Sequence, residues 1–294
     1  MGLRALWDVV APAKLNLFLH VTGRRADGYH LLQSVFVLID WCDTLHFERR
    51  DDARLLRHDL AGPLPDDDLC LRAARLLQSE SGCRRGVDIS IEKRVPWGAG
   101  MGGGSSDAAS TLQALNRLWG LHWPLARLMA LGLRLGADLP FFLGGRNAFV
   151  EGIGERLTPL PLPRAWYGVI KPAAAIETRA IFDSPLLKRD TEAVILAGFL
   201  ADTAGSVRQV LGGVGRNDLQ PPAEAHCADV ATAAALLQRC FGNSRMTGSG
   251  SAVFARAGTG AEPTMAMPAE LPPGWVGRMC RSLESHPLAG WATD

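Results

Sequence analysis

The first third of the chain has the hydrophobic pattern of a β-sheet. Apolar and polar positions alternate along residues 15–21 and again along 44–48, which is the period of two expected of half-buried strands. Residues 34–39 are almost entirely apolar, as in a strand buried on both faces. We therefore predict an antiparallel sheet in which Lys14 and Asn16 lie on the same face of the first strand.

Three segments in the first half show helical spacing of apolar residues. They are a helix with an acidic start at 66–68 that ends near 79–82, a helix that follows Ser106 and includes Trp119, and a helix over 124–135. An alternating strand is expected over 87–91 and another at 147–150. The order strand, glycine-rich loop, helix over 87–119 places the glycines at a helix N-terminus.

The second half mixes strands and helices without strict alternation, which is typical of an α+β fold. Strands are expected at 166–170 and 253–255, and helices around 192–200 and 223–241. Three prolines at alternate positions in 159–163 favour an extended, unpaired backbone. We expect the domain boundary there, with one domain over 1–160 and a second over 161–294.

Composition excludes several classes of ligand. The formal net charge is +1 among 31 basic and 30 acidic residues, so no overall field draws the protein to nucleic acid or to an anionic membrane. The six cysteines form no C-x-x-C pair, which argues against a zinc site or a disulfide framework. No signal pattern and no apolar run of about 18 residues occurs. These features predict a cytoplasmic protein with reduced thiols and a small-molecule ligand.

Lysine is rare among the basic residues. The chain has only four lysines, so arginine is its default cation. Because ammonium and guanidinium groups differ in shape and hydration, a retained lysine is mildly informative. The lysines are Lys14, Lys93, Lys171 and Lys188.

The segment from Gly98 to Ser106 is the strongest local signal for chemistry. Glycines let backbone N–H groups converge on an anion, and the helix N-terminus that follows adds partial positive charge. A tight connection that binds nothing is the structural alternative. A dinucleotide-binding loop would need an acidic residue about 20 positions later, and none occurs over 119–125. No lysine follows the glycines, which excludes a Walker A loop.

Two further segments offer polar groups. Lys14 and Asn16, about 7 Å apart along one strand face, could hold a charged or hydroxyl-bearing substrate, although a solvated strand end would look the same. Asp138 stands between a glycine-rich turn and Pro140 at an expected helix start. Such an aspartate is often an N-cap, and in apolar surroundings it is also a candidate general base.

Taken in order, these segments resemble the GHMP kinases, named for galactokinase, homoserine, mevalonate and phosphomevalonate kinases. The fuller pattern is similar to the branch whose acceptor is a methylerythritol linked to cytidine diphosphate, in the non-mevalonate route to isoprenoid precursors. The motifs that carry the resemblance are Pro12–Leu17, Arg25–Leu31, Pro96–Ala109, Gly136–Pro140, Glu151–Glu155, Asn217–Asp218 and Thr247–Gly250.

The resemblance implies an S5-domain-2-like N-terminal domain packed on a ferredoxin-like C-terminal domain, with the active site between them. It implies ATP and Mg²⁺ as cofactors, with Asp138 as catalytic base and Lys14 as its electrostatic partner. The substrate-binding residues would be Asn16, Tyr29, His30, Phe182 and Gly248. The nucleotide-binding residues would be Pro96, Trp97, Gly98, Ala99, Gly100, Met101, Gly102, Gly103, Gly104, Ser105, Ser106 and Asp68.

Three residues depart from the family pattern. Ala99 replaces a glycine, so its backbone must accept negative φ. Asp107 replaces a common asparagine and adds negative charge near the expected phosphate site, and Asp68 removes an amide donor from the expected adenine pocket. The alternatives are another GHMP kinase, a catalytically silent relative that binds a ligand, and, more remotely, a NAD-dependent oxidoreductase. The segment Arg25–Leu31 argues against the first, and Lys14 with Asp138 argues against the second.

Overall fold

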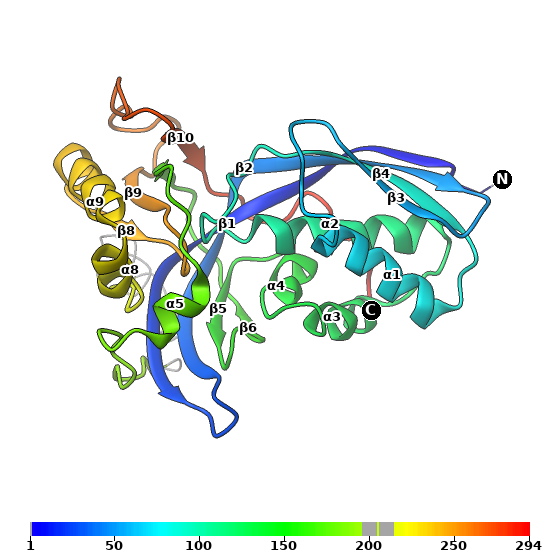
Figure 1. Ribbon diagram of the computed structural model, residues 1–294, viewed down its shortest axis with the longest axis horizontal. Helices are drawn as coiled ribbons and strands as arrows, with labels where there is room; N and C mark the ends of the chain where they lie inside the picture. Colours follow the sequence, from blue (N-terminus) through cyan, green and yellow to red (C-terminus); the bar gives the residue numbers. More distant parts are fainter. Residues whose placement is uncertain (1, 196–204, 206–214) are drawn as a thin grey trace.

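A computed structural model describes residues 2–195, 205 and 215–294 of the chain. Two sheets with helices packed on them make up the molecule, and two long strands run from one to the other (Figure 1). The strands are β1 (Ala5–Arg24), β2 (His30–Arg50), β3 (Leu55–Asp59), β4 (Gly86–Glu92), β5 (Ala148–Glu151), β6 (Arg156–Pro159), β7 (Trp166–Lys171), β8 (Arg245–Met246), β9 (Val253–Gly258) and β10 (Val276–Arg281). The helices are α1 (Leu69–Ser81), α2 (Gly103–Leu118), α3 (Leu125–Leu133), α4 (Leu139–Gly144), α5 (Thr178–Asp183), α8 (Gln220–His226) and α9 (Ala228–Phe241).

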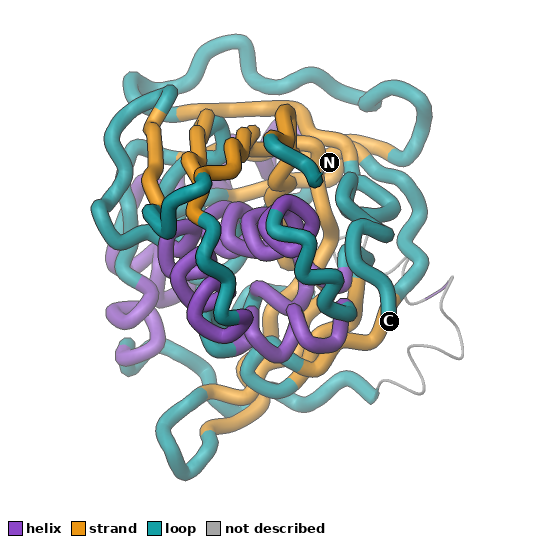
Figure 2. Tube along the Cα trace, turned by 90° about the vertical axis from the view of Figure 1, so that its right-hand side faces the viewer, coloured by secondary structure: helices purple, strands orange, loops and turns teal. Residues whose placement is uncertain are grey.

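The N-terminal sheet has the order β3-β4-β2-β5-β6, with β1 paired to β2. All its pairs are antiparallel except β3 with β4. Helices α1 to α4 form a layer on one side of this sheet, which Figure 2 shows from the end of the molecule. A cluster of buried apolar residues from both layers, including Phe47, Leu112 and Phe142, fills the space between them.

β1 and β2 are each one long strand, where the pattern predicted shorter, separate ones. Register shifts interrupt their pairing at four places, one of them between Pro12 and Lys14 and another between Asn16 and Leu19. Such bulges bend and twist a ribbon, so these two strands can extend from the N-terminal sheet to the C-terminal part of the molecule. The alternation of apolar and polar residues shifts at each bulge, which explains why the sequence predicted several short strands instead of two long ones.

The C-terminal sheet is antiparallel, with the order β10-β7-β9-β8. Apolar residues of α9, such as Leu237, pack on this sheet together with Leu219, which lies just before α8. A middle cluster, in which Leu15 and Phe149 meet Tyr167 and Phe254, joins the two sheets. The chain is therefore a mixed α+β fold, as the pattern predicted.

Several elements differ from the expected ones. The helix expected over 223–241 is two helices, because Cys227 is extended (φ −145°, ψ 106°) between α8 and α9. Residues 192–195 are not helical, and the rest of the helix expected over 192–200 lies outside the described residues. No sequence pattern predicted β3, β6, β10 or α5, because these elements are short or lack alternation. None of the described helices is long and apolar enough to cross a membrane.

The last residues of the chain return to the N-terminal sheet and its helices. Leu283 N donates to Leu38 O at 2.8 Å, and Asp294 accepts a hydrogen bond from Ala126 N at 2.8 Å. Leu288 is buried in the same apolar cluster as α1 to α4. The C-terminus accordingly lies beside α3 (Figure 1). The segment after β10, which the sequence left unassigned, completes the N-terminal core.

Candidate active site

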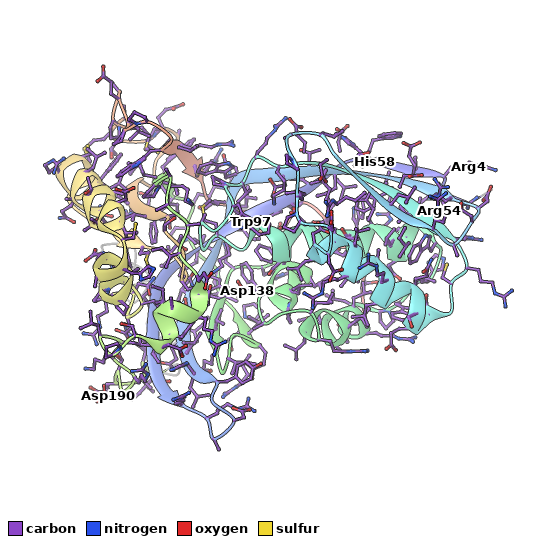
Figure 3. The ribbon with its side chains drawn as sticks, viewed as in Figure 1. Arg4, Arg54, His58, Trp97, Asp138 and Asp190 are labelled. Carbon is purple, nitrogen blue, oxygen red and sulfur yellow. The ribbon has the colours of Figure 1, made fainter. Side chains whose placement is uncertain are left out.

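A pocket of about 860 Å³ lies where the two parts of the molecule meet. Its walls come from β1 and β2, the glycine loop, the start of α4, α5 and the turn at Gly248. Figure 3 shows Asp138 near the middle of the molecule. Nine residues that the sequence analysis singled out line this pocket: Lys14, Asn16, Tyr29, His30, Gly100, Gly102, Asp138, Phe182 and Gly248.

Lys14, Asn16 and Asp138 form a polar group at the buried end of this pocket. Lys14 Nζ lies 2.7 Å from Asn16 Oδ1 and 3.6 Å from Asp138 Oδ2. The Lys14 side chain is almost fully buried, whereas 31% of the Asp138 side chain is exposed. Burial lowers the pKa of Lys14, and the Asp138 carboxylate opposes that shift. The structure thus brings together the two residues that the sequence proposed as a catalytic pair.

Hydrogen bonds fix both the side chain and the backbone N–H of Asn16. Its amide nitrogen donates to Ser34 Oγ at 3.0 Å, and Thr247 Oγ1 donates to its side-chain oxygen at 3.2 Å. The Asn16 backbone N–H donates to the same Thr247 hydroxyl at 2.9 Å. Strand β1 and the Thr247–Gly250 segment are therefore tied together at the pocket.

Asp138 is not a capping residue. Helix α4 begins at Leu139, but the Asp138 side chain makes no capping hydrogen bond to it. The carboxylate faces Lys14 across the pocket instead. The structure therefore does not support the N-cap interpretation and leaves this carboxylate available to a ligand.

The glycine loop has the left-handed backbone that its glycines allow. Gly98, Gly100 and Gly102 have φ of 65°, 76° and 70°, whereas Ala99 is not among the positive-φ residues, as its side chain requires. A Cβ on Gly100 would lie 2.3 Å from Thr247 O, and one on Gly102 would lie 2.9 Å from the Phe142 ring. The loop is therefore packed closely against its neighbours, and only glycine fits these two positions.

The loop leads into the N-terminus of α2, where backbone N–H groups can receive an anion. Gly102 precedes the helix and provides no side-chain cap. Ser106 N donates to Gly102 O at 2.9 Å as the first hydrogen bond of the helix. The N–H groups of residues 103–105 therefore have no partner within the helix. Ser105 is half-buried, whereas Ser106 is fully buried and its Oγ has no hydrogen-bond partner among the described residues. The geometry is that of a phosphate-binding helix terminus.

Other residues proposed for the nucleotide are spread along the loop. Trp97 is 63% exposed and Figure 3 shows it near the crossing of β1 and β2, while Ala99 and Met101 are buried. Asp68 is not in the pocket: its side chain caps α1 by accepting from Leu71 N at 3.0 Å and lies 3.2 Å from Arg57 Nη1. The carboxylate of Asp68 is therefore occupied by structural contacts.

A buried charge cluster of Asp43, Lys93 and Asp107 lies behind the loop, and sequence reasoning did not identify it. Lys93 Nζ contacts the Asp43 carboxylate and lies 2.6 Å from Asp107 Oδ2. Asp43 also accepts the N–H groups of Arg94 at 2.6 Å and Val95 at 2.8 Å, where the loop begins. Asp107 therefore has a cation beside it, which offsets the negative charge expected near the phosphate site. The scarcity of lysine was the signal that could have pointed to Lys93.

The titration of this cluster is shifted. Burial raises the pKa of Asp107 to about 8, with Lys93 opposing and Asp43 adding to the shift. The two carboxylates hold the pKa of Lys93 above its usual range although burial opposes them. The lysine accordingly stays charged, and Asp107 is the group of the cluster whose pKa is raised.

Aromatic side chains line the opposite end of the pocket. Tyr29 is 61% exposed on the β1–β2 turn. The rings of His30 and Phe182 are stacked, with centroids 4.9 Å apart and planes 29° apart. Gly248, with φ of 58°, packs against the backbone of Gly100 between the two ends. These four residues, which were expected to bind substrate, line the same pocket.

Comparisons with known proteins agree with this geometry. Residues 68–146 match the family model of the GHMP kinases N terminal domain. The chain is 68% identical to the 4-diphosphocytidyl-2-C-methyl-D-erythritol kinase of Methylibium petroleiphilum, over 99% of this chain and 100% of that one. The enzyme of the same name from Albidiferax ferrireducens is 55% identical, over 99% and 97% of the two chains.

Solved structures give the same result. A crystal structure of 4-(cytidine 5'-diphospho)-2C-methyl-D-erythritol kinase matches with a TM-score of 0.71 at 32% identity, over 92% of this chain and 98% of that one. The homoserine kinase of Cytophaga hutchinsonii matches with a TM-score of 0.70 at 17% identity, over 96% of both chains, and shares the fold. The chain therefore belongs to the 4-diphosphocytidyl-2-C-methyl-D-erythritol kinase family of the GHMP kinases.

Proposed function

We infer that this protein uses ATP to phosphorylate the 2-hydroxyl of 4-diphosphocytidyl-2-C-methyl-D-erythritol, a step towards isoprenoid precursors in the non-mevalonate pathway. One observation carries the inference: a lysine–aspartate pair and an aromatic group lie at opposite ends of one pocket. The full-length relatives named for this reaction support the same substrate.

We propose Asp138 as the general base that accepts the proton of the attacking hydroxyl. Its carboxylate is partly exposed in the pocket and is not used as a helix cap. In phosphoryl transfer the protein mainly positions the two oxygens and offsets the charge of the transferred group. Lys14 Nζ, 3.6 Å from the same carboxylate, would hold Asp138 and contribute positive potential. Asn16 would orient the methylerythritol end through its fixed amide.

The glycine loop would bind the phosphates of ATP. The left-handed Gly100 and Gly102 and the uncapped N-terminus of α2 present backbone N–H groups without side chains in the way. A nucleotide bound there would have its phosphates at the Lys14 end of the pocket, since a Cβ on Gly102 would lie 3.3 Å from Lys14 Cε. The contact expected for Asp68 stays a prediction, because its carboxylate is engaged with α1 and Arg57.

Magnesium would accompany the nucleotide. The described residues contain no group of three or more His, Cys, Asp or Glu side chains that could hold a metal by themselves. Mg²⁺ fits such a site, because it commonly keeps several waters and binds through substrate phosphates and one or two protein groups. Bound there, it would offset charge on the β and γ phosphates. Ser105 is the more accessible of the two loop serines as a ligand.

The aromatic end would recognise cytidine. Tyr29 and Phe182 offer ring faces for stacking, which is nearly blind to which base is bound. His30 follows Tyr29 in sequence and stacks on Phe182, and it supplies the polar group that can read a base edge. Selectivity would therefore depend on hydrogen bonds rather than on the stacked rings.

The test is an ADP-release assay with the purified protein, ATP and Mg²⁺. The expected acceptor is 4-diphosphocytidyl-2-C-methyl-D-erythritol, with homoserine and mevalonate as negative controls. Turnover of the first compound alone supports the proposal. Binding of that compound without turnover would instead support a catalytically silent protein of this fold.

A further inference from the structure

Arg189 lies just outside the pocket and contacts the ring of His30. Its Nε is 3.3 Å from His30 Nε2, and Arg189 is not among the residues that line the pocket. The rest of its guanidinium donates to three backbone carbonyls, those of Phe182 at 2.8 Å, Ser184 at 3.0 Å and Leu187 at 3.1 Å. The guanidinium is therefore fixed in one orientation behind the histidine.

This contact determines where the proton of His30 sits. A guanidinium only donates hydrogen bonds and stays protonated in proteins, so His30 Nε2 must accept with its lone pair. The ring proton is then on Nδ1 and the imidazole is neutral. Among the hydrogen bonds of the part of the chain that the structure describes, none engages Nδ1. The ring thus keeps one free donor.

The surroundings of His30 also favour the neutral imidazole. Burial lowers the pKa of His30, the cations Arg189 and Arg24 lower it further, and Asp183 opposes them. The stacked Phe182 ring fixes the plane of the imidazole, and the Phe182 carbonyl is bound by the same guanidinium. Arg189 therefore contacts both the imidazole and the backbone of the residue that stacks on it.

We propose that Arg189 is a positioning residue that holds His30 as a neutral Nδ1–H donor and so makes the pocket select cytosine over uracil. This inference rests on the proposed function and deepens it. Cytosine N3 is an acceptor and pairs with an N–H donor, whereas uracil presents an N3–H donor at the same place. A donor that faces a donor leaves both unpaired, and a single such mismatch reduces binding by about ten-fold.

The first test reads the histidine directly in the unmodified protein. A long-range ¹H–¹⁵N correlation spectrum, with His30 identified by its loss in His30→Asn, distinguishes the two neutral tautomers and the imidazolium. The proposal expects a protonated Nδ1 and an unprotonated Nε2 at pH 7. A protonated Nε2 overturns it. In Arg189→Met, the pKa of His30 is expected to rise, because a nearby cation has been removed.

The second test measures discrimination. We expect Arg189→Met to reduce the ratio of kcat/KM for the cytidine substrate over its uridine analogue by about ten-fold, through KM and with kcat nearly unchanged. Arg189→Lys keeps a donor and is expected to restore part of the ratio. An unchanged ratio in Arg189→Met with normal KM overturns the proposal.

A matched variant separates positioning from general loosening of the loop. The amide of His30→Asn offers an N–H near the Nδ1 position without help from Arg189, so adding Arg189→Met to it should change the ratio no further. An equal additional loss in the double variant would assign Arg189 a structural role only. Wild-type protein that phosphorylates neither compound would refute the proposed function, while the tautomer measurement would still decide the state of His30.

Discussion

The two ends of the pocket are built differently. At the Lys14 end every polar group is buried or bonded to a neighbour, and the backbone is packed so closely that Gly100 and Gly102 tolerate no Cβ. At the Tyr29 end the Tyr29 ring is 61% exposed on a turn, and His30 and Phe182 are partly buried. The groups that act on the reacting atoms are thus enclosed before substrate arrives, whereas the rings that would contact the base are more accessible to solvent.

This contrast separates the expected effects of mutation on kcat from those on KM. Changes at the Lys14 end should reduce the rate of the chemical step. Changes at the Tyr29 end should weaken binding and leave the rate at saturation nearly intact.

The largest effect is expected for Asp138→Asn. The amide keeps the shape of the side chain but cannot accept a proton, so kcat should fall by about 10² to 10⁴ while ATP affinity is retained. Steady-state kinetics and nucleotide titration measure the two quantities. Asp51→Asn is the matched control, because the Asp51 side chain is 79% exposed and lies outside the pocket, and its kcat should stay near that of wild type. A tenth or more of wild-type kcat in Asp138→Asn would remove Asp138 as the base.

Lys14→Arg should be nearly as damaging as Lys14→Ala. The ammonium lies between Asn16 and Asp138 and against Gly102 and Phe36, so a longer planar group has no room there. The measurement is kcat of both variants, with Lys188→Arg as the control outside the pocket. Equal rates for Lys14→Arg and wild type would reduce Lys14 to a structural charge.

Tyr29→Ala should raise KM for the cytidine substrate by about ten-fold or more, since stacking of a base on an aromatic ring contributes about 1 to 3 kcal/mol. kcat should change little, and Tyr29→Phe should behave like wild type. KM for 2-C-methyl-D-erythritol 4-phosphate, which lacks the base, should be unaffected. A lowered kcat in Tyr29→Ala would end the separation between the two ends of the pocket.

The smallest effect concerns the charge cluster behind the loop. The pKa of Asp107 is raised to about 8 by burial, so between the usual range of a carboxyl and pH 8 the folded state holds a proton that the unfolded chain releases. Stability should therefore fall as pH rises through this window. Asp107→Asn should lose that dependence.

Melting temperatures at pH 6 and pH 9 test this expectation. The decrease between them should be smaller in Asp107→Asn than in wild type. Asp51→Asn, whose side chain is 79% exposed, should behave like wild type. An unchanged pH dependence in Asp107→Asn would mean that the cluster releases no proton in this range.

The sequence predicted those features of the fold and the site that depend on neighbouring residues. The alternation in β1 and β2, the stripe of α2 and the glycines before it result from neighbouring residues, and they were readable in advance. Asp138 could be placed at a helix start, but whether it capped α4 depended on Lys14, far away in sequence. The contacts of Asp68 also depend on a distant residue: its position suggested a nucleotide contact, which stays a prediction, while Arg57 and α1 engage its carboxylate.

Long-range contacts were beyond such reasoning. Lys93 meets Asp43 across 50 residues, and Arg189 meets His30 across 159 residues, without any shared periodicity. Rare residue types partly compensate, because Lys14 and Lys93 are two of four lysines and both form ion pairs with aspartates near the pocket or the loop. Arg189 had no such signal among the many arginines.

The return of the last residues to the N-terminal core has a consequence for synthesis. Many proteins made from the N-terminus complete their first domain while the rest is still being translated. Here Leu288 belongs to the same apolar cluster as α1 to α4, and Leu283 adds to the backbone of β2 at Leu38. A growing chain on the ribosome therefore carries an N-terminal core that stays open on one side until residues 283–288 have been made. The N-terminal elements are therefore made first, but their core is among the last parts of the fold to be completed.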